Sequence, residues 1–239
     1  MVAGTLYLIP TTLGESPLSL IIPQQVQKIA AGLTVFVAEN PKTARQYLKQ
    51  LELVTPLQEI EIFTLDKHTK PAQLTQFLQP ALAGKDIGLV SEAGCPAVAD
   101  PGALLVRLAH EKGLRVVPLV GPSSILLALM ASGMNGQAFA FHGYLPIQKA
   151  ERGRKISGLE KESILRDQTQ IFIETPYRNQ AMFEDIIQVC EPGTELCIAT
   201  DITLITEHIE TRTIAEWRKK APDINKKPTI FLLYRPRSG

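Results

Sequence analysis

The stretch Leu89-Val-Ser-Glu-Ala-Gly-Cys-Pro-Ala-Val-Ala-Asp-Pro-Gly102 decides the fold class of this 239-residue chain. It overlaps a short apolar run, Asp86–Val90, and leads into a helix-length segment, Pro101–Lys112, and another apolar run, Arg115–Val120. An apolar strand, a turn of small residues, a helix and a second apolar strand are typical of a unit with parallel strands. The stretch therefore predicts an α/β fold with a parallel, doubly wound sheet.

The same alternation continues on both sides of this stretch. Strands are predicted in the first half at Thr5–Ile9, Thr34–Ala38 and Glu59–Leu65, with helices at Gln24–Ala31, Lys42–Leu51 and Pro71–Ala83. In the second half, strands are predicted at Phe139–Tyr144, Thr169–Ile173, Glu195–Thr200, His208–Thr213 and Thr229–Tyr234, with helices at Ile125–Ser132, Glu151–Arg166, Thr175–Val189 and Ile214–Lys220. The close spacing of two of these strands predicts a hairpin, so the second sheet is expected to be mixed. We expect two α/β domains, residues 1–121 and 122–239.

Composition and charge limit the choice of partners. Hydrophobic residues make up 45% of the chain and charged residues 21%, which is ordinary for a globular protein. The net charge of +1 means that a nucleic acid would have to bind a local basic patch. The one basic cluster is Lys149-Ala-Glu-Arg-Gly-Arg-Lys155, which is either a solvated helix entry or a phosphate-contacting patch. The chain has no signal-peptide pattern and no apolar run of about 18 residues, so we expect a cytoplasmic protein without a membrane partner.

Three loops rich in glycine and proline follow predicted strands: Pro10–Gly14, Ser91–Pro96 and Gly121–Ser124. Ligands of open α/β sheets bind at this carboxyl edge, and glycines let them approach the backbone. No GxGxxG, GxxxxGK[ST] or GxSxG pattern is present, which argues against a common NAD enzyme, a P-loop NTPase and a serine hydrolase. The four histidines and three cysteines fit no metal-ligand spacing, so no metal is predicted. Asp100-Pro101 is also explained as a helix start.

Several segments, taken together and in order, resemble the tetrapyrrole methylase superfamily. They are Gly4–Pro10, Leu89–Gly102 and Val116–Ser124, followed by Phe141-His-Gly-Tyr-Leu-Pro146 and Ile173-Glu-Thr-Pro-Tyr-Arg178. Within the superfamily, the chain is most similar to the branch that methylates a 16S ribosomal RNA cytidine on its ribose 2′-oxygen. The resemblance covers nearly the whole chain.

This resemblance implies an S-adenosylmethionine-dependent methyltransferase, with the cofactor in a cleft between two α/β domains and usually a homodimer. The cofactor-binding residues that it implies are Pro10, Ser91, Ala93, Gly94, Asp100, Gly121, Ser123, Ser124, Tyr144, Ala199, Thr200, Pro228 and Thr229. The substrate would be ribosomal RNA or the small ribosomal subunit. The expected phosphate contacts are Lys149, Arg152, Arg154 and Lys155.

The chain departs from the usual pattern of that branch in several loops. It has Ser91-Glu-Ala-Gly-Cys-Pro96 in place of Ser-Asp-Ala-Gly-Thr-Pro, and Ala38-Glu-Asn-Pro-Lys42 in place of Ala-Glu-Asp-Thr-Arg. A ribose hydroxyl is a poor nucleophile, so a nearby proton acceptor would help, and Glu39 and Glu92 are the candidate catalytic residues. Two alternatives stay open: a methyltransferase acting on a small, tetrapyrrole-like molecule, and a non-catalytic protein that binds S-adenosylmethionine.

Overall fold

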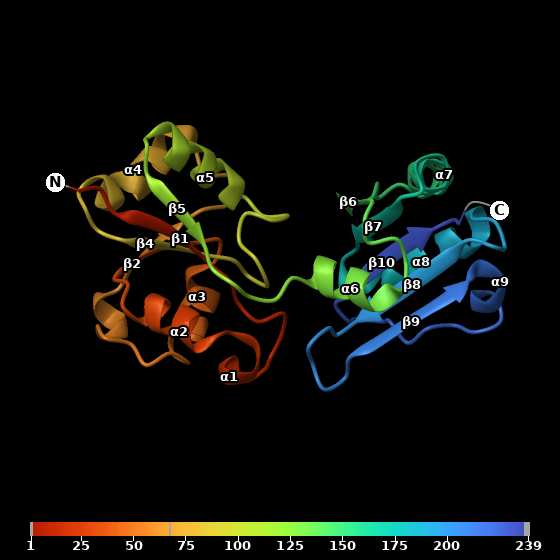
Figure 1. Cartoon of the computed structure of the whole chain (residues 1–239), viewed down its shortest axis with the longest axis horizontal. Coiled ribbons are helices and arrows are strands. Elements are labelled where there is room, and N and C mark those ends of the chain that lie inside the picture. Colours follow the sequence, from red (N-terminus) through yellow and green to blue (C-terminus); the bar gives the residue numbers. More distant parts are fainter. Residues whose placement is uncertain (1, 67, 237–239) are drawn as a thin grey trace. The chain divides into compact units, whose positions relative to one another are not determined.

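The computed structural model describes residues 2–66 and 68–236 and divides the chain into two compact units, Met1–Ser123 and Ser124–Gly239 (Figure 1). The division falls two residues after the expected boundary. Each unit contains one five-stranded sheet. Among the described residues, no helix is both long and apolar enough to cross a membrane.

The first unit is built on a parallel sheet, as predicted. Its strands are β1 (Thr5–Ile9), β2 (Val35–Ala38), β3 (Glu61–Thr64), β4 (Ile87–Val90) and β5 (Arg115–Pro118). Their order is β3-β2-β4-β1-β5, and every neighbouring pair is parallel. Because β1 lies between β4 and β5, the loops after these three strands meet at one edge of the sheet.

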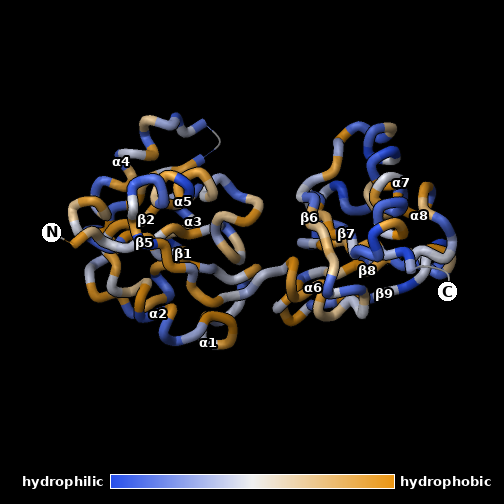
Figure 2. The backbone as a smooth tube through the Cα atoms, turned by 45° about the horizontal axis from the view of Figure 1, so that its top comes forward, coloured by the Kyte–Doolittle hydropathy of each residue, from blue (hydrophilic) through white to orange (hydrophobic). Residues whose placement is uncertain are grey.

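Helices cover both faces of this sheet. They are α1 (Leu18–Ile21), α2 (Gln24–Ala31), α3 (Pro41–Leu48), α4 (Pro71–Leu82) and α5 (Gly102–Glu111), with a short 3₁₀ helix, η1 (Leu57–Glu59). One buried cluster joins the sheet to α4 and α5 through residues such as Leu78 and Leu105. A second joins the opposite face to α1, α2 and α3 through Leu18, Val26 and Leu48. Figure 2 shows hydrophobic residues concentrated along the strands between these layers.

The second unit contains the expected mixed sheet. Its strands are β6 (Phe139–Tyr144), β7 (Thr169–Ile173), β10 (Thr229–Tyr234), β8 (Glu195–Thr200) and β9 (His208–Thr213), given in their spatial order. Only β6 and β7 are parallel, and β8 and β9 form the predicted hairpin. The helices are α6 (Ser124–Ser132), α7 (Lys149–Arg166), α8 (Asn179–Val189) and α9 (Ile214–Trp217), with η2 (Pro176–Arg178). The buried cluster of this unit joins α7, α8 and α9 to one face of the sheet, whereas α6 contacts β9 and β10.

Candidate functional site

The three loops of the first unit are joined by a backbone hydrogen bond and by close packing. The Thr11 amide donates a hydrogen bond of 3.0 Å to the Gly94 carbonyl oxygen, which joins the loop after β1 to the loop after β4. The loop after β5 is equally close, since a Cβ atom on Gly121 would lie 2.2 Å from Pro10 Cγ. The absence of a side chain at Gly121 is therefore a steric requirement of this loop junction.

The Leu89–Gly102 stretch has an unusual backbone. Gly94 has φ +72°, and Ala97 and Ala99 also have positive φ values, of 65° and 60°. Such values strain residues that carry a Cβ atom. The Asp100 carboxylate holds the turn in place by accepting the Ala97 amide at 2.9 Å and the Gly102 amide at 2.8 Å. The prediction that Asp100 stabilises a helix start is confirmed in substance, although α5 begins at Gly102 with Pro101 as its N-cap.

Two buried hydroxyl groups stabilise the same loops. Ser91 Oγ donates a hydrogen bond of 2.7 Å to the Gly94 carbonyl oxygen, and Thr11 Oγ1 lies 3.4 Å from Ser91 Oγ. Both residues are buried. Cys95 Sγ lies 3.4 Å from the Pro122 carbonyl oxygen, and burial raises the pKa of this thiol above its ordinary value. Ser91 thus supports the loop, and Cys95 lies against the third loop as an un-ionised thiol.

The two candidate catalytic carboxylates lie at neighbouring strand ends. Glu39 follows β2 and Glu92 follows β4, and these strands pair directly. Burial raises the pKa of Glu39 above its ordinary value, and the negative charges of Glu92, Asp100 and Asp66 raise it further. Glu92 Oε1 accepts a hydrogen bond of 2.6 Å from Thr43 Oγ1 of α3. The carboxyl edge of this sheet is therefore acidic, and the pKa of Glu39 is raised both by burial and by its negatively charged neighbours.

A hollow of about 200 Å³ lies at this edge. Its wall includes Thr11 and Leu13 after β1, Thr43 of α3, and Glu92 and Ala93 after β4. Thr11 and Thr43 were not among the predicted site residues. The hydrogen bond from the Thr11 amide to Gly94 and the hydrogen bond from Thr43 to Glu92 depend on the order of the strands in the sheet, which the sequence does not specify. The predicted residues Pro10, Ser91, Ala93, Gly94, Asp100 and Gly121 all belong to these loops.

In the second unit, most of the remaining predicted cofactor residues come from one end of the sheet. Strand register places Tyr144 opposite Ile173, Ile173 opposite Ile230, and Ile230 opposite Ala199. Thr229 lies opposite Thr200, and the Pro228 carbonyl oxygen accepts the Asp201 amide at 3.0 Å. Tyr144, Ala199, Thr200, Pro228 and Thr229 therefore lie near one another. Ser123 is the last residue of the first unit, and Ser124 begins α6.

The basic cluster occupies the start of α7, but one of its members lies elsewhere than expected. Arg152 is buried, and its guanidinium binds the buried Asp185 carboxylate, with Nη2 2.6 Å and Nε 2.7 Å from Oδ2. It also donates a hydrogen bond of 2.7 Å to the Ile147 carbonyl oxygen. The structure thus contradicts the expectation that Arg152 contacts substrate, because its charge is already neutralised inside the unit. Lys149, Arg154 and Lys155 are exposed.

Comparison with known proteins places the chain among curated methyltransferases, although no family model matches it. A ribosomal RNA small subunit methyltransferase I from Vibrio cholerae is 30% identical over 240 residues, which cover 99% of this chain and 79% of the relative. The Bacillus subtilis protein of the same name is 30% identical over 89% of this chain and 68% of its own length. The Escherichia coli O157:H7 protein is 28% identical over 96% of this chain and 77% of its own length.

Solved structures of tetrapyrrole methyltransferases share the fold. The methyltransferase CobJ matches with a TM-score of 0.65 and 18% identity, over 99% of this chain and 98% of the other. A Thermus thermophilus uroporphyrin-III C-methyltransferase complexed with S-adenosylhomocysteine matches with a TM-score of 0.58 and 14% identity, over 97% and 98% of the two chains. The predicted fold and superfamily are thus confirmed, and the chain belongs to the ribosomal RNA small subunit methyltransferase I family, a family of S-adenosylmethionine-dependent methyltransferases.

Proposed function

We propose that this protein transfers a methyl group from S-adenosylmethionine to a ribose 2′-oxygen of small-subunit ribosomal RNA. The observation that carries the proposal is the juncture of the loops after β1, β4 and β5, in a chain whose curated relatives are named ribosomal RNA methyltransferases. The proposal includes cytoplasmic action and a homodimer.

The first-unit loops suit the cofactor in shape and charge. Ala93 lines the hollow with only a small side chain, and the close contacts of Gly94 and Gly121 with the neighbouring loops hold the backbone groups of these loops in place. The carboxylates Glu39, Glu92 and Asp100 favour a cationic ligand such as a sulfonium. When bound, S-adenosylmethionine supplies an electrophilic methyl group. We propose the same cofactor role for Pro10, Ser91, Ser123, Ser124, Tyr144, Ala199, Thr200, Pro228 and Thr229.

Glu39 is the better candidate for the residue that accepts the proton of the ribose hydroxyl. A carboxylate with a raised pKa is a stronger base, and catalysis by a positioned base improves as its pKa approaches the working pH. Glu92 raises the pKa of Glu39 and is held by Thr43, so we assign Glu92 a positioning role. The chain's own contribution is then to hold both partners, exclude water and accept one proton.

Three acceptors distinguish this function from its alternatives. Tritium transfer from labelled S-adenosylmethionine is measured to 30S subunits, to naked 16S ribosomal RNA and to a tetrapyrrole substrate, alongside calorimetry with S-adenosylhomocysteine. We expect cofactor binding and transfer to one of the RNA acceptors, at the ribose 2′-oxygen. Transfer to the tetrapyrrole alone would establish the small-molecule alternative. Binding without transfer to any acceptor would leave a non-catalytic cofactor-binding protein.

Glu39→Ala is expected to lower methyl transfer by roughly 10²- to 10⁴-fold while S-adenosylhomocysteine binding stays near that of the wild type. Wild-type transfer is expected to decline at low pH as Glu39 becomes protonated, and its raised pKa moves that decline to a higher pH than an ordinary carboxyl would. Single-turnover rates across pH measure both effects. Glu59→Ala is the matched control, because Glu59 is exposed near the opposite end of the same sheet, where β3 begins. Full activity in Glu39→Ala would exclude Glu39 as the base.

A further inference from the structure

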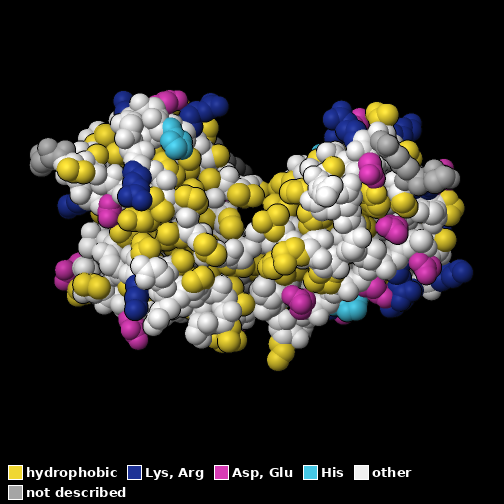
Figure 3. Space-filling model, in the orientation of Figure 1, with side chains coloured by type: hydrophobic (Ala, Val, Ile, Leu, Met, Phe, Trp, Pro, Cys, Tyr) yellow, Lys and Arg dark blue, Asp and Glu magenta, His cyan; other side chains and the backbone are white. Residues whose placement is uncertain are grey.

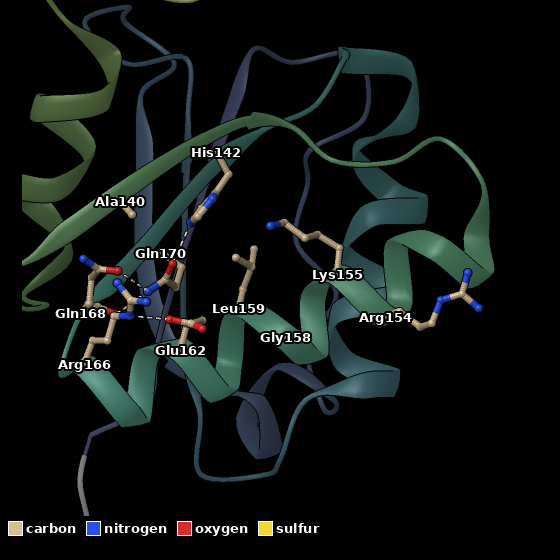
Figure 4. A pocket seen from close by; sticks show the side chains of 10 residues that line it. All are labelled: Ala140, His142, Arg154, Lys155, Gly158, Leu159, Glu162, Arg166, Gln168 and Gln170. Carbon is tan, nitrogen blue, oxygen red and sulfur yellow. Dashed lines mark hydrogen bonds and ion pairs between the residues drawn. The ribbon is translucent and has the colours of Figure 1, made fainter.

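A second cavity lies wholly within the second unit, between α7 and the edge strand β6. Its volume is about 500 Å³, within the roughly 300–1,000 Å³ that is usual for small-ligand sites. Its wall comes from β6, from α7, and from the region of Gln168 and Gln170 around the start of β7 (Figure 4). It shares no residue with the loops of the first unit.

The cavity is cationic on its helix side. Arg154, Lys155 and Arg166 line it together with a single carboxylate, Glu162. Arg166 Nε is paired with Glu162 at 2.6 Å, whereas the side chains of Arg154 and Lys155 form no hydrogen bond or ion pair with any described residue. In Figure 4 the Lys155 ammonium extends across the cavity toward β6, and Arg154 points away from it. Figure 3 shows Lys and Arg side chains gathered near α7 on the surface of this unit. Lys155 therefore offers an unpaired charge to an anion inside the cavity.

The strand side of the cavity carries ordered polar groups. His142 Nε2 and Gln170 Oε1 are 2.7 Å apart, and the Gln170 amide nitrogen donates to the carbonyl and side-chain oxygens of Gln168 at 3.1 Å. Because Gln170 Oε1 must then accept, His142 Nε2 carries the proton and Nδ1 stays available to a ligand. The β6 register shifts between Phe141 and Tyr144, and Gly143 has φ +63°. Such a bulge changes the direction in which a side chain points, and this one lies in the edge strand β6.

Gly158 lies in the middle of α7 and also lines the cavity. A glycine inside a helix is unfavourable relative to alanine. Packing does not require a glycine here, because a Cβ atom on Gly158 would meet nothing within 4 Å outside the helix's own backbone. The missing side chain instead leaves open space beside Lys155.

We propose that this cavity binds one nucleotide of the RNA substrate, with its phosphate on Lys155 and its base beside His142 and Gln168. The phosphate matches the unpaired ammonium, and the mixed donors and acceptors of the strand side match the edge of a nucleobase. This inference rests on the proposed function, since it assigns the cavity to the same RNA. Its role is to hold the substrate at a point separate from the methyl-transfer loops.

Two pairs of variants test the cavity in the full-length protein. Lys155→Ala removes the charge, with Lys161→Ala as its control, because Lys161 is an exposed lysine of α7 outside the cavity. Gly158→Leu fills the open space, with Gly153→Ala as its control, because Gly153 is the other glycine of α7 and a Cβ atom there would make only an ordinary 3.5 Å contact with Val189. Binding to a labelled single-stranded fragment of 16S ribosomal RNA is measured across salt concentrations, with cytidine monophosphate as a competitor.

We expect Lys155→Ala to weaken RNA binding by about tenfold and to reduce the salt slope by about 1, as for one lost phosphate contact. Gly158→Leu should weaken binding by a similar factor. Gly153→Ala should raise Tm by about 2–4 °C without weakening RNA binding, as expected for a helical glycine replaced by alanine. S-adenosylhomocysteine affinity should be unchanged in all four variants.

Wild-type RNA affinity and salt slope in both Lys155→Ala and Gly158→Leu would overturn the assignment, even if methyl transfer to RNA is found. Direct binding of cytidine monophosphate, measured by calorimetry, in a protein that does not bind the RNA fragment would also overturn it, because the ligand would then be a free nucleotide. Conversely, if RNA binding depends on Lys155 but no methyl group reaches RNA, the proposed function fails and the nucleotide site stands.

Discussion

Arg152→Ala lowers the free energy of unfolding of the second unit by about 3–5 kcal/mol, the cost of breaking a buried ion pair on one side. Both partners are almost inaccessible, with side-chain exposures of 7% for Arg152 and 4% for Asp185. The substitution leaves the Asp185 carboxylate without a close partner. Lys149 does not compensate, because its ammonium is 3.7 Å from Oδ1 and its side chain is 73% exposed.

The single tryptophan of the chain provides a specific measurement. Trp217 is 1% exposed in the core of the second unit, and its ring packs edge-on against Phe183 of α8, the helix that carries Asp185. Its fluorescence during urea unfolding therefore reports the unit in which the ion pair lies. Arg154→Ala, two residues along the same helix, is the control and should stay within about 0.5 kcal/mol of the wild type.

A double variant separates ion pairing from packing. Arg152→Met combined with Asp185→Leu replaces both charges by apolar groups, and should recover a substantial part of the lost stability. If Arg152→Ala unfolds like the wild type but loses RNA affinity, the guanidinium contacts substrate and the buried ion pair with Asp185 does not stabilise the unit.

The prediction that Arg152 contacts substrate was wrong for a specific reason. Residues 149–155 read as one basic cluster, yet a helix directs neighbouring residues to different faces. Arg152 lies on the same stripe as Ile156, Leu159 and Ser163, all of which are buried. The apolar spacing of α7 contained the information needed to place Arg152 inside, but its acidic partner on α8 became visible only in the structure.

Most of the strands were predictable because they are short apolar runs bounded by turn residues, whereas β9 alternates His, Glu and Arg with β-branched residues. All ten appear within a few residues of their expected positions, and the mixed character of the second sheet followed from the hairpin of β8 and β9. The four-residue helix α1 was missed, since Leu18–Ile21 is too short for a helical period and lies between Pro17 and Pro23. The order β3-β2-β4-β1-β5 depends on pairing between distant segments, which local patterns do not specify.

The candidate site was predictable to a similar extent: its loops could be located, but the contacts between them could not. The sequence indicated that Gly94 and Gly121 belong to loops at one sheet edge, because each follows a predicted strand, whereas Glu39 became a candidate only through the resemblance of the Ala38–Lys42 segment. It did not indicate the Thr11–Gly94 backbone bridge or the charges around Glu39, which arise only once β1, β2 and β4 are neighbours. The cavity beside α7 was invisible for the same reason, since it needs His142, Lys155 and Gln170 on three different elements.

Gly121→Ala is expected to weaken S-adenosylhomocysteine binding by at least about tenfold and to destabilise the first unit by about 1–3 kcal/mol, as overpacking does. The added Cβ atom would lie 2.2 Å from Pro10 Cγ and 2.3 Å from Pro10 Cβ, both carbons of a rigid ring. The loops after β1 and β5 must then separate, which misplaces the backbone that we propose holds the cofactor. Calorimetry and thermal unfolding measure the two effects.

Two further variants decide between this explanation and a general loss of folding. Gly136→Ala is the control, because a Cβ atom there meets nothing within 4 Å, and it should bind S-adenosylhomocysteine like the wild type. Adding Pro10→Gly to Gly121→Ala removes both clashing carbons, so it should restore much of the stability. Cofactor affinity should recover less, since Pro10 itself belongs to the proposed site. Wild-type affinity in Gly121→Ala would mean that the loop junction is rigid for the fold alone, and that the cofactor is held elsewhere.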